Sequence, residues 1–369
     1  MMLAQTTWFH QQNYPVTAAF FYDKENLHNK WAADYQIPIV NFKGWRFGAP
    51  SLINAGRLLG ALWRLWRFLR EKNIEVIETF TPHSDLVGLP IAWLARVPVR
   101  VGCYQGIIHT MPAWQAWIHA RLINTAIVTG FVGVSNQMVE LAIEAGVQPG
   151  NVVMIPNAVN IPDADMEADL RSHRERLRKE LGVPDGGVLT ITSARLDKEK
   201  GHTYFLRAIR EIVDSFPKVI FAFAGDGYLR KALEKQADQL GVRDNVRFLG
   251  IRFDMLALFR AADIFVLPSL AEGLSLALLE AMTARLPIIA TSVQGSKDVV
   301  LHEQSGFLVE AANIEALEAA IIRMLNQADR WDAFGQCARD TVLEGYTIDS
   351  VCRRYDEYFQ GLLGSKVLI

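Results

Sequence analysis

Short runs of β-branched and aromatic residues alternate along nearly the whole chain with segments of helix length that carry an apolar stripe. This alternation is typical of α/β proteins, in which helices connect the strands of parallel sheets. Strands are expected over 17–22, 74–80, 99–104, 130–135, 152–156, 187–194, 218–224, 246–249, 263–267 and 287–291. Helices are expected between them, for example over 201–216, 228–240 and 313–326. The pattern therefore predicts an α/β fold with parallel sheets.

A charged segment divides this pattern into two halves. Residues 160–184 are rich in Asp, Glu and Arg and contain Pro162 and Pro184, and a length of 369 residues suggests two domains. We predict an N-terminal domain at 1–160, a linker at 161–184, a C-terminal domain at 185–345 and a final amphipathic helix within 346–369. Two Rossmann-like domains of this kind hold ligands in the cleft between them, at the carboxyl ends of the strands.

Composition excludes several classes of protein. The net charge of −2 gives no general electrostatic case for nucleic-acid binding. Cys103, Cys337 and Cys352 are far apart and odd in number, so they predict free thiols rather than disulfides or a zinc site. No apolar run reaches the roughly 18 residues of a membrane span, and the first ten residues have no basic segment typical of a signal peptide. A cytoplasmic location is the default expectation.

The run from Pro268 to Met282 carries the strongest functional signal. A buried strand leads into a loop with Glu272 and Gly273, Ser275 is a plausible N-cap, and Glu280 lies in the helix that follows. A helix N-terminus suits a phosphate because its N–H groups point outward and its dipole is positive there. Carboxylates beside such a site suit hydroxyl groups. Phosphate among hydroxyl-rich groups describes a sugar nucleotide.

A second motif supplies positive charge after another strand. Arg195 and Lys200 stand five residues apart, and Gly201 opens the next helix. Arginine can bind phosphate oxygens with two N–H groups, and lysine adds a point charge. Lys198 is the competing cation in this loop.

Two further segments follow strands and contain glycine, and the first of them bears on the choice of cofactor. Residues 224–227 read Ala-Gly-Asp-Gly, but position 230 is Arg, so the three-glycine dinucleotide fingerprint is incomplete and a nicotinamide enzyme is not expected. Residues 246–251 read Val-Arg-Phe-Leu-Gly-Ile and form a second strand end.

The seven-residue spacing between Glu272 and Glu280, with the flanking residues 265–269 and 279–282, resembles the E-x7-E element of retaining GT-B glycosyltransferases, especially family 4. Arg195 and Lys200 match the R-L-x-x-x-K-G motif of the same family. The resemblance implies two Rossmann-like domains and a final helix that returns to the first. It implies a nucleoside-diphosphate sugar donor, UDP- or GDP-linked, and no cofactor or metal.

The resemblance also implies roles for single residues. Arg195 and Lys200 would bind the diphosphate, helped by N–H groups at Gly273, Leu274 and Ser275. Glu280 would bind the ribose, and Glu272 would bind the sugar and support its developing positive charge. Gly225, Gly250 and Ile251 would lie near the nucleotide. No nucleophile is evident on the other sugar face, which favours front-face displacement.

Some positions depart from the family pattern. Arg285 stands where glycine is usual, Gln294 replaces the first of two glycines, and Asp298 replaces a glutamate. On the acceptor side, Gln105 occupies the place of a usual His or Arg, and His109 is a substitute candidate. The family also opens with a strand and a glycine-rich loop, whereas this sequence starts inside what resembles the first helix. We therefore expect an N-terminal domain that lacks its first strand.

Other interpretations stay open at this stage. The two glutamates alone would fit an ordinary amphipathic helix. A GT-B sugar-nucleotide epimerase and a non-catalytic interaction protein, including a truncated inactive form, are the alternative functions. The acceptor can be a glycan, a lipid-linked molecule or a small molecule, in the synthesis of a polysaccharide or glycoconjugate. Residues 57–70 combine Arg and Trp on one helix, which favours a sheet-covering helix but keeps contact with a membrane surface open.

Overall fold

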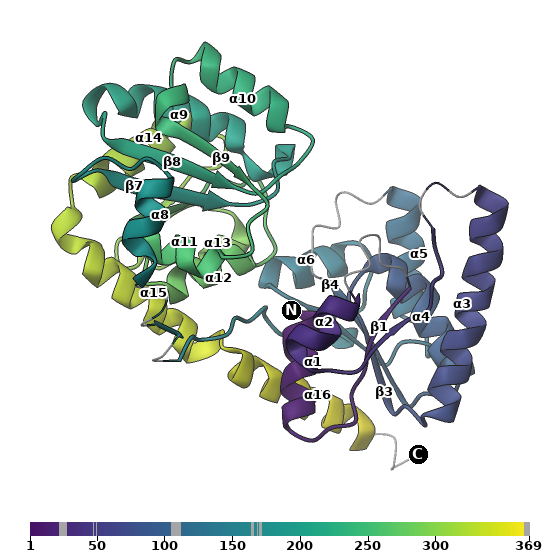
Figure 1. Ribbon diagram of the computed structural model, residues 1–369. Helices are drawn as coiled ribbons and strands as arrows, with labels where there is room; N and C mark the ends of the chain where they lie inside the picture. The colour runs from purple at the N-terminus through teal and green to yellow at the C-terminus, as the bar shows by residue number, and fades with distance from the viewer. Residues whose placement is uncertain are drawn as a thin grey trace. The chain divides into compact units, whose positions relative to one another are not determined.

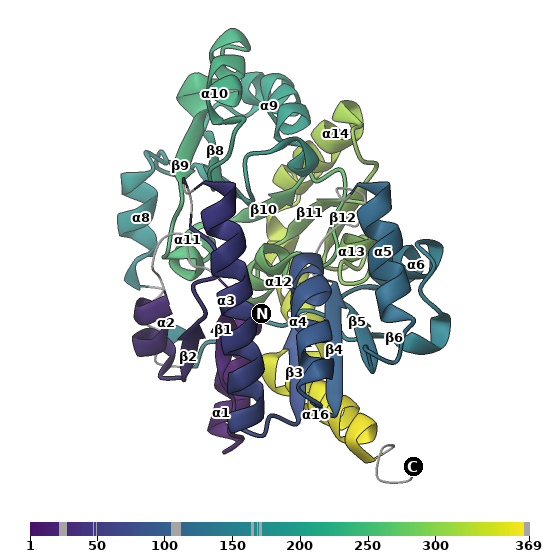
Figure 2. The same cartoon turned by 90° about the vertical axis from the view of Figure 1, so that its right-hand side faces the viewer.

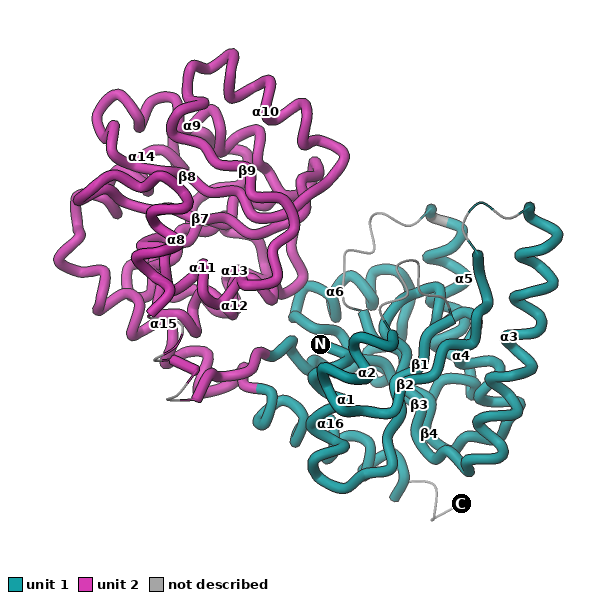
Figure 3. Tube along the Cα trace, in the orientation of Figure 1, with its two compact units in different colours: residues 1–158, 348–369 teal, residues 159–347 magenta. Residues whose placement is uncertain are grey.

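The computed structural model describes residues 1–21, 28–46, 48, 50–104, 112–163, 166–167, 169 and 172–364. Two units are distinguished by their contacts: Met1–Ala158 with Ile348–Ile369, and Val159–Thr347 (Figure 3). All paired strands among the described residues run parallel. The predicted α/β class with parallel sheets is confirmed.

Unit 2 is built on a six-stranded sheet in the order β12-β11-β10-β7-β8-β9. Figure 1 labels three of its neighbouring strands, β7, β8 and β9. Its strands are β7 (Val188–Ser193), β8 (Val219–Ala224), β9 (Val246–Gly250), β10 (Ile264–Leu267), β11 (Ile288–Thr291) and β12 (Gly306–Val309). The chain runs outward from β7 to β9, then returns to place β10 on the other side of β7. Because the strand order reverses there, β7 and β10 form the switch point at which α/β sheets bind ligands.

Helices cover both faces of this sheet. One face carries α9 (His202–Ser215), α10 (Arg230–Gln239) and α14 (Ile314–Leu325). The other carries α8 (Arg174–Glu180), α11 (Met255–Ala261), α12 (Leu276–Thr283) and α15 (Trp331–Gly345), with α13 (Gln294–Lys297) after β11. Short 3₁₀ turns complete the unit: η3 (Lys198–Lys200), η4 (Arg243–Asn245) and η5 (Ala328–Arg330).

Apolar spacing explains these helices. In α9 the buried residues Phe205, Leu206, Ile209, Ile212 and Val213 repeat at the interval of one helical face. Such a stripe is buried against the strands and neighbouring helices of the unit, and the opposite side of the helix is polar. The predicted helices 201–216, 228–240 and 313–326 agree with α9, α10 and α14 to within one or two residues.

The segment before β7 is joined to unit 2 by a pair of arginines. Arg174 Nη2 and Arg178 Nη1 of α8 bind the two carboxylate oxygens of Asp263 at 2.6 and 2.8 Å. Asp263 also accepts the Leu189 N–H at 2.8 Å. These ion pairs therefore hold α8 next to Asp263, the residue directly before β10.

Unit 1 contains two parallel sheets instead of one. One sheet joins β3 (Val76–Thr79), β4 (Val99–Tyr104), β5 (Gly130–Gly133) and β6 (Val152–Met154), and the other joins β1 (Ala18–Phe20) to β2 (Ile39–Asn41). The expected strands do not include β2. No strand among the described residues connects β1 to β3, although Phe21, Val40 and Ile77 pack against one apolar cluster.

Helices also cover the sheets of unit 1. They are α1 (Met2–Gln11), α2 (His28–Tyr35), α3 (Ser51–Glu71), α4 (Pro82–Leu94), α5 (Ala113–Ile123), α6 (Asn136–Glu144) and α16 (Ile348–Gly364), with the turn η2 (Pro149–Asn151). The last helix, α16, contacts α1 and buries Val351, Cys352 and Tyr355 in the core of this unit. The N- and C-terminal helices of the chain thus belong to the same unit.

Candidate donor-binding site

The predicted site residues of unit 2 gather at the carboxyl ends of neighbouring strands. Arg195 and Lys200 follow β7, Glu272 follows β10, Gly225 follows β8, and Gly250 ends β9. These four strands are adjacent in the sheet. Motifs up to 77 positions apart in the sequence therefore lie at the same edge of the sheet, beside the switch point.

Lys200 and Glu272 form the centre of this arrangement. Lys200 Nζ lies 2.6 Å from Glu272 Oε1, and both side chains are largely buried. The Ser269 hydroxyl donates to the same oxygen at 2.8 Å. Both contacts engage Oε1, so two groups fix this oxygen of the carboxylate in place.

Close backbone contacts hold the Glu272 loop in position. A Cβ on Gly201 would lie 1.9 Å from Pro268 O, and a Cβ on Gly295 would lie 1.5 Å from Gly273 O. Only glycine allows backbones to approach this closely. The Leu270 N–H also donates to Glu199 O at 2.7 Å, which joins the loop after β10 to the turn that carries Lys200.

Arg195 has an exposed side chain above a fixed backbone. Its Nη1 lies 3.0 Å from Asp197 Oδ2, and its carbonyl oxygen accepts a hydrogen bond from His202 Nε2 at 3.0 Å. Burial lowers the pKa of His202 to about 4, so the ring is neutral near pH 7. The backbone at Arg195 is thus held by an uncharged donor, and the guanidinium faces solvent.

The N-terminus of α12 follows Glu272 directly. Ser275 is its N-cap, and the Ser275 hydroxyl accepts the Leu278 N–H at 3.3 Å, as predicted. Gly273 and Leu274 precede this cap. The backbone N–H groups of the first turn have no acceptor within the helix, which suits an anion. Glu280 lies further along α12, and burial raises the pKa of its carboxyl above the usual value.

Gly225 and Gly250 form a third part of the site. The Gly225 N–H donates to Gly250 O at 2.8 Å, and a Cβ on Gly225 would lie 2.0 Å from Ala194 O. Both glycines have positive φ, 138° and 68°, which other residues rarely adopt. Ile251, next in sequence, has an exposed side chain. The ends of β8 and β9 are therefore joined at Gly225, which packs closely against the backbone of Ala194, the residue before Arg195.

The acceptor-side candidates Gln105 and His109 lie outside the described residues. The strand that precedes them ends in a buried polar network. Tyr104 OH lies 2.8 Å from His119 Nδ1, His119 Nε2 lies 2.7 Å from Asp85 Oδ2, and the Thr79 hydroxyl donates to Asp85. These partners come from β4, α5, α4 and β3, so the network fixes the end of β4 in unit 1.

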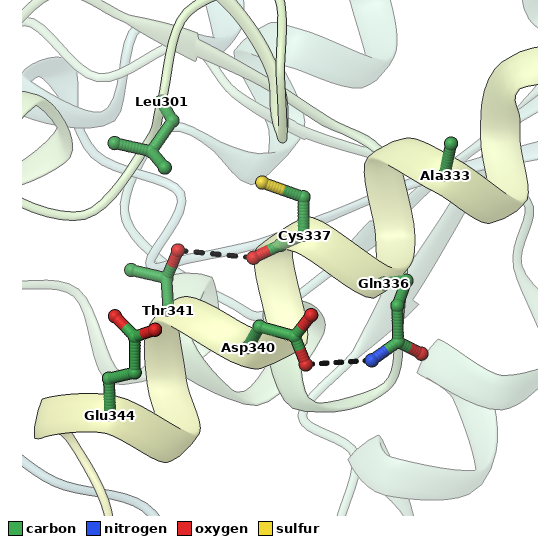
Figure 4. A pocket seen from close by; sticks show the side chains of 7 residues that line it. All are labelled: Leu301, Ala333, Gln336, Cys337, Asp340, Thr341 and Glu344. Carbon is green, nitrogen blue, oxygen red and sulfur yellow. Dashed lines mark hydrogen bonds between the residues drawn. The ribbon is translucent and has the colours of Figure 1, made fainter.

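A hollow on unit 2 involves none of these residues. Figure 4 shows side chains of α15 around it, with Leu301 at one side. Its lining residues are Leu301, Ala333, Gln336, Cys337, Asp340, Thr341 and Glu344. Among the described residues, no group of three or more His, Cys, Asp or Glu side chains is arranged to hold a metal ion.

Sequence reasoning missed several residues that support the site. Asp197, Ser269 and His202 each contact a predicted residue, and the Thr291 hydroxyl donates to Ser269 O. Asp197 and Ser269 stand inside the motifs that we identified, so their position in those motifs was the available signal. Thr291 belongs to the next strand, and only the fold brings it to Ser269.

Comparisons with known proteins agree with this geometry. The family model for glycosyl transferases group 1 matches residues 173–341, and the glycosyl transferase 4-like domain matches residues 29–158. The chain is 26% identical over 315 residues to the UDP-Gal:alpha-D-GlcNAc-diphosphoundecaprenol alpha-1,3-galactosyltransferase of Escherichia coli, covering 82% of this chain and 80% of that protein.

A second relative matches a shorter part. The GDP-mannose-dependent alpha-(1-6)-phosphatidylinositol monomannoside mannosyltransferase of Mycolicibacterium smegmatis is 30% identical over 193 residues, which cover 50% of each protein. The chain likewise spans about half the length of several other curated relatives.

Solved structures show the same fold. Anabaena HepE in complex with UDP-glucose has a TM-score of 0.84 at 19% identity, covering 97% of this chain and 94% of that chain. Sucrose-phosphate synthase from Thermosynechococcus elongatus has a TM-score of 0.79 at 19% identity, covering 98% and 92%. Since two family models cover most of both units and the fold matches that of solved glycosyltransferase structures, the chain belongs to the GT-B glycosyltransferases of group 1, the family 4-like type.

Proposed function

We propose that this glycosyltransferase transfers a hexose, with retention of anomeric configuration, from a UDP- or GDP-sugar to a glycan, lipid-linked or small-molecule acceptor. The contact between Lys200 and Glu272 is the observation that carries the proposal. It brings a cation that suits a diphosphate next to a carboxylate that suits sugar hydroxyls, and this pair supports the proposal.

The charges around Glu272 support this assignment. An ammonium group has three N–H donors, so Lys200 can keep its bond to Glu272 Oε1 and still donate to a phosphate oxygen. Since Ser269 and Lys200 both engage Oε1, Oε2 is the atom that would accept a hydroxyl of the donor sugar. The same carboxylate would then stabilise positive charge on the sugar as the glycosidic bond breaks.

The leaving group would be stabilised by Arg195, Lys200 and the first turn of α12. Negative charge on the diphosphate increases during bond cleavage, and fixed cations and N–H groups near it lower the barrier. We propose that these groups serve in place of a metal ion, with the acceptor attacking from the face that the diphosphate leaves. Glu280 would accept hydrogen bonds from the ribose hydroxyls.

The relatives guide the choice of acceptor. The E. coli relative is named for a diphosphoundecaprenol acceptor and the mycobacterial one for a phosphatidylinositol mannoside. We propose a role in polysaccharide or glycoconjugate synthesis on the cytoplasmic side of the cell.

Donor turnover tests the proposal. The full chain is incubated with UDP- and GDP-sugars, and release of nucleoside diphosphate is measured with and without excess EDTA. We expect turnover of at least one donor, unchanged by EDTA, with an α-linked donor yielding an α-linked product by NMR. Glu272→Gln should lower kcat by roughly 100-fold or more, because the charge beside the developing cation is lost. A β-linked product would refute retention of configuration. A loss of activity in EDTA that Mn²⁺ restores would refute transfer without a metal ion.

A further inference from the structure

Six of the nine tryptophans have exposed side chains, and all six belong to one stretch of unit 1: Trp45, Trp63, Trp66, Trp93, Trp114 and Trp117. Tryptophan is usually mostly buried in a soluble protein. Such a concentration of exposed tryptophan in one stretch indicates an interaction surface.

Helix α3 has two apolar faces, of which one is buried in unit 1 and the other is exposed to solvent. Ala61, Leu65 and Leu69 are buried in an apolar cluster of unit 1 that also includes residues of α4 and of strands β2 and β3. On the outer side Leu59, Trp63 and Trp66 follow each other at spacings of four and three residues, and Leu52 lies two turns before them. The exposed fraction of Leu52 is 89% and that of Trp63 is 57%.

Helix α5 repeats the same pattern. Trp114, Trp117, Ile118 and Arg121 have exposed side chains at spacings of three, one and three residues, which place them along one face. The opposite face buries His119 and Ala120 in unit 1. Sequence spacing therefore gives each helix one face toward the core and one apolar face toward solvent.

Helix α4 lies next to both α3 and α5 and so connects their exposed apolar faces. Figure 2 shows the three helices side by side on the same face of unit 1. Trp93 and Leu94, at the end of α4, are exposed as well. We call the exposed residues Leu52, Leu59, Trp63, Trp66, Trp93, Leu94, Trp114, Trp117 and Ile118 the tryptophan surface.

Positive charge accompanies the tryptophan surface. Residues 43–121 contain ten Lys or Arg and four Asp or Glu, whereas the whole chain has a net charge of −2. Arg67 lies over the Trp63 ring at 5.6 Å and Arg121 over the Trp117 ring at 4.9 Å. Arg70 and Arg96 are exposed nearby in the sequence.

We propose that the tryptophan surface binds an anionic phospholipid bilayer. Tryptophan rings with arginine one turn away match the interface of such a bilayer, where rings enter the headgroup region and arginines meet phosphate. No helix among the described residues is long and apolar enough to cross a membrane, so the contact would be peripheral. This inference goes beyond sugar transfer, since it concerns unit 1 and can be tested without a donor.

Vesicle sedimentation with the full chain tests the proposal. We expect binding to phosphatidylcholine vesicles that contain phosphatidylglycerol, weak binding to phosphatidylcholine alone, and a loss of binding between 0.1 and 1 M salt as charges are screened. Trp63→Ala with Trp117→Ala should lower the partition coefficient about tenfold or more. Arg121→Gln should lower it about fivefold.

Matched variants serve as controls. Tyr35→Ala removes another exposed ring of unit 1, and Arg207→Gln removes an exposed arginine of α9 in unit 2. Both should bind vesicles like the wild type, and circular dichroism should show that every variant is folded. No binding to anionic vesicles, or equal losses in the controls, would overturn the proposal. So would a stable dimer that dissociates in the double Trp variant while the wild type ignores vesicles, because the surface would then join two copies.

Discussion

Glu272 is the side chain on which the proposed donor site depends most. Its Oε1 accepts from Lys200 and from Ser269, and the side chain is largely buried. A buried carboxylate without such partners would cost several kcal/mol. The lysine is therefore needed for the stability of the loop as well as for the proposed diphosphate contact.

Arg195 differs from Lys200 because its side chain is exposed while its backbone is fixed. Arg195→Ala should therefore fold normally and lower kcat more than it raises KM. Charge on the diphosphate grows as the bond breaks, so part of the contact exists only in the transition state. A loss of roughly 100-fold in kcat is expected. Lys198→Ala, an exposed neighbour, is the control, and a similar loss in both would remove Arg195 from this role.

Glu78 gives a pH dependence to strand β3. Burial raises the pKa of its carboxyl to about 8, and Gln5 Nε2 donates to it at 2.7 Å. Between the ordinary glutamate pKa and about 8, the folded chain holds a proton that the unfolded chain has lost. The free energy of unfolding should therefore fall with rising pH in this window, by about 1.4 kcal/mol per pH unit from this group.

The variant Glu78→Gln keeps the size and shape of the side chain but has no group that ionises. Denaturant unfolding at pH 5, 6, 7 and 8 should show the wild type losing stability relative to this variant as the pH rises. A constant difference across the series would mean that Glu78 ionises normally in the folded chain.

Arg285 follows the end of helix α12, and its backbone conformation lowers the stability of this helix end. Its φ is 60°, the left-handed region that glycine adopts without strain. Arg285→Gly should raise the free energy of unfolding by about 1 kcal/mol, seen as a higher Tm. Arg207→Gly, inside α9, should lower it by a similar amount because glycine weakens a helix interior. A lower Tm for both would show that the Arg285 side chain stabilises the helix end.

Much of the element pattern was predictable from the sequence. Strands such as β7, β8 and β10 are continuous apolar runs, and Ser275 has the residue type and position of an N-cap. Strand β2 was missed because Pro38 interrupts the apolar run before Ile39–Asn41, and a proline inside a run argues against a strand. The network of Asp85, His119 and Tyr104 was also missed, since its partners lie 15 and 34 positions apart and each looks ordinary alone.

At the scale of the molecule, the two units carry different features. The proposed donor-site residues Arg195, Lys200, Glu272 and Glu280 all belong to unit 2, whereas the tryptophan surface belongs to unit 1. The sequence could predict the motifs of the donor site because their spacing is local. It could not predict that Lys200 and Glu272, 72 positions apart, would share one buried ion pair.

Calorimetric titration of the full chain with UDP and with GDP tests the central claim, that Lys200 and Glu272 mark the diphosphate site. We expect the wild type and Lys198→Ala to bind at least one of the two with similar affinity. Lys200→Ala should bind it about tenfold or more weakly, because a charged hydrogen bond is lost and Glu272 then repels the phosphate. Failure of the wild type to bind either nucleotide, or equal affinity of Lys200→Ala and wild type, would contradict the account.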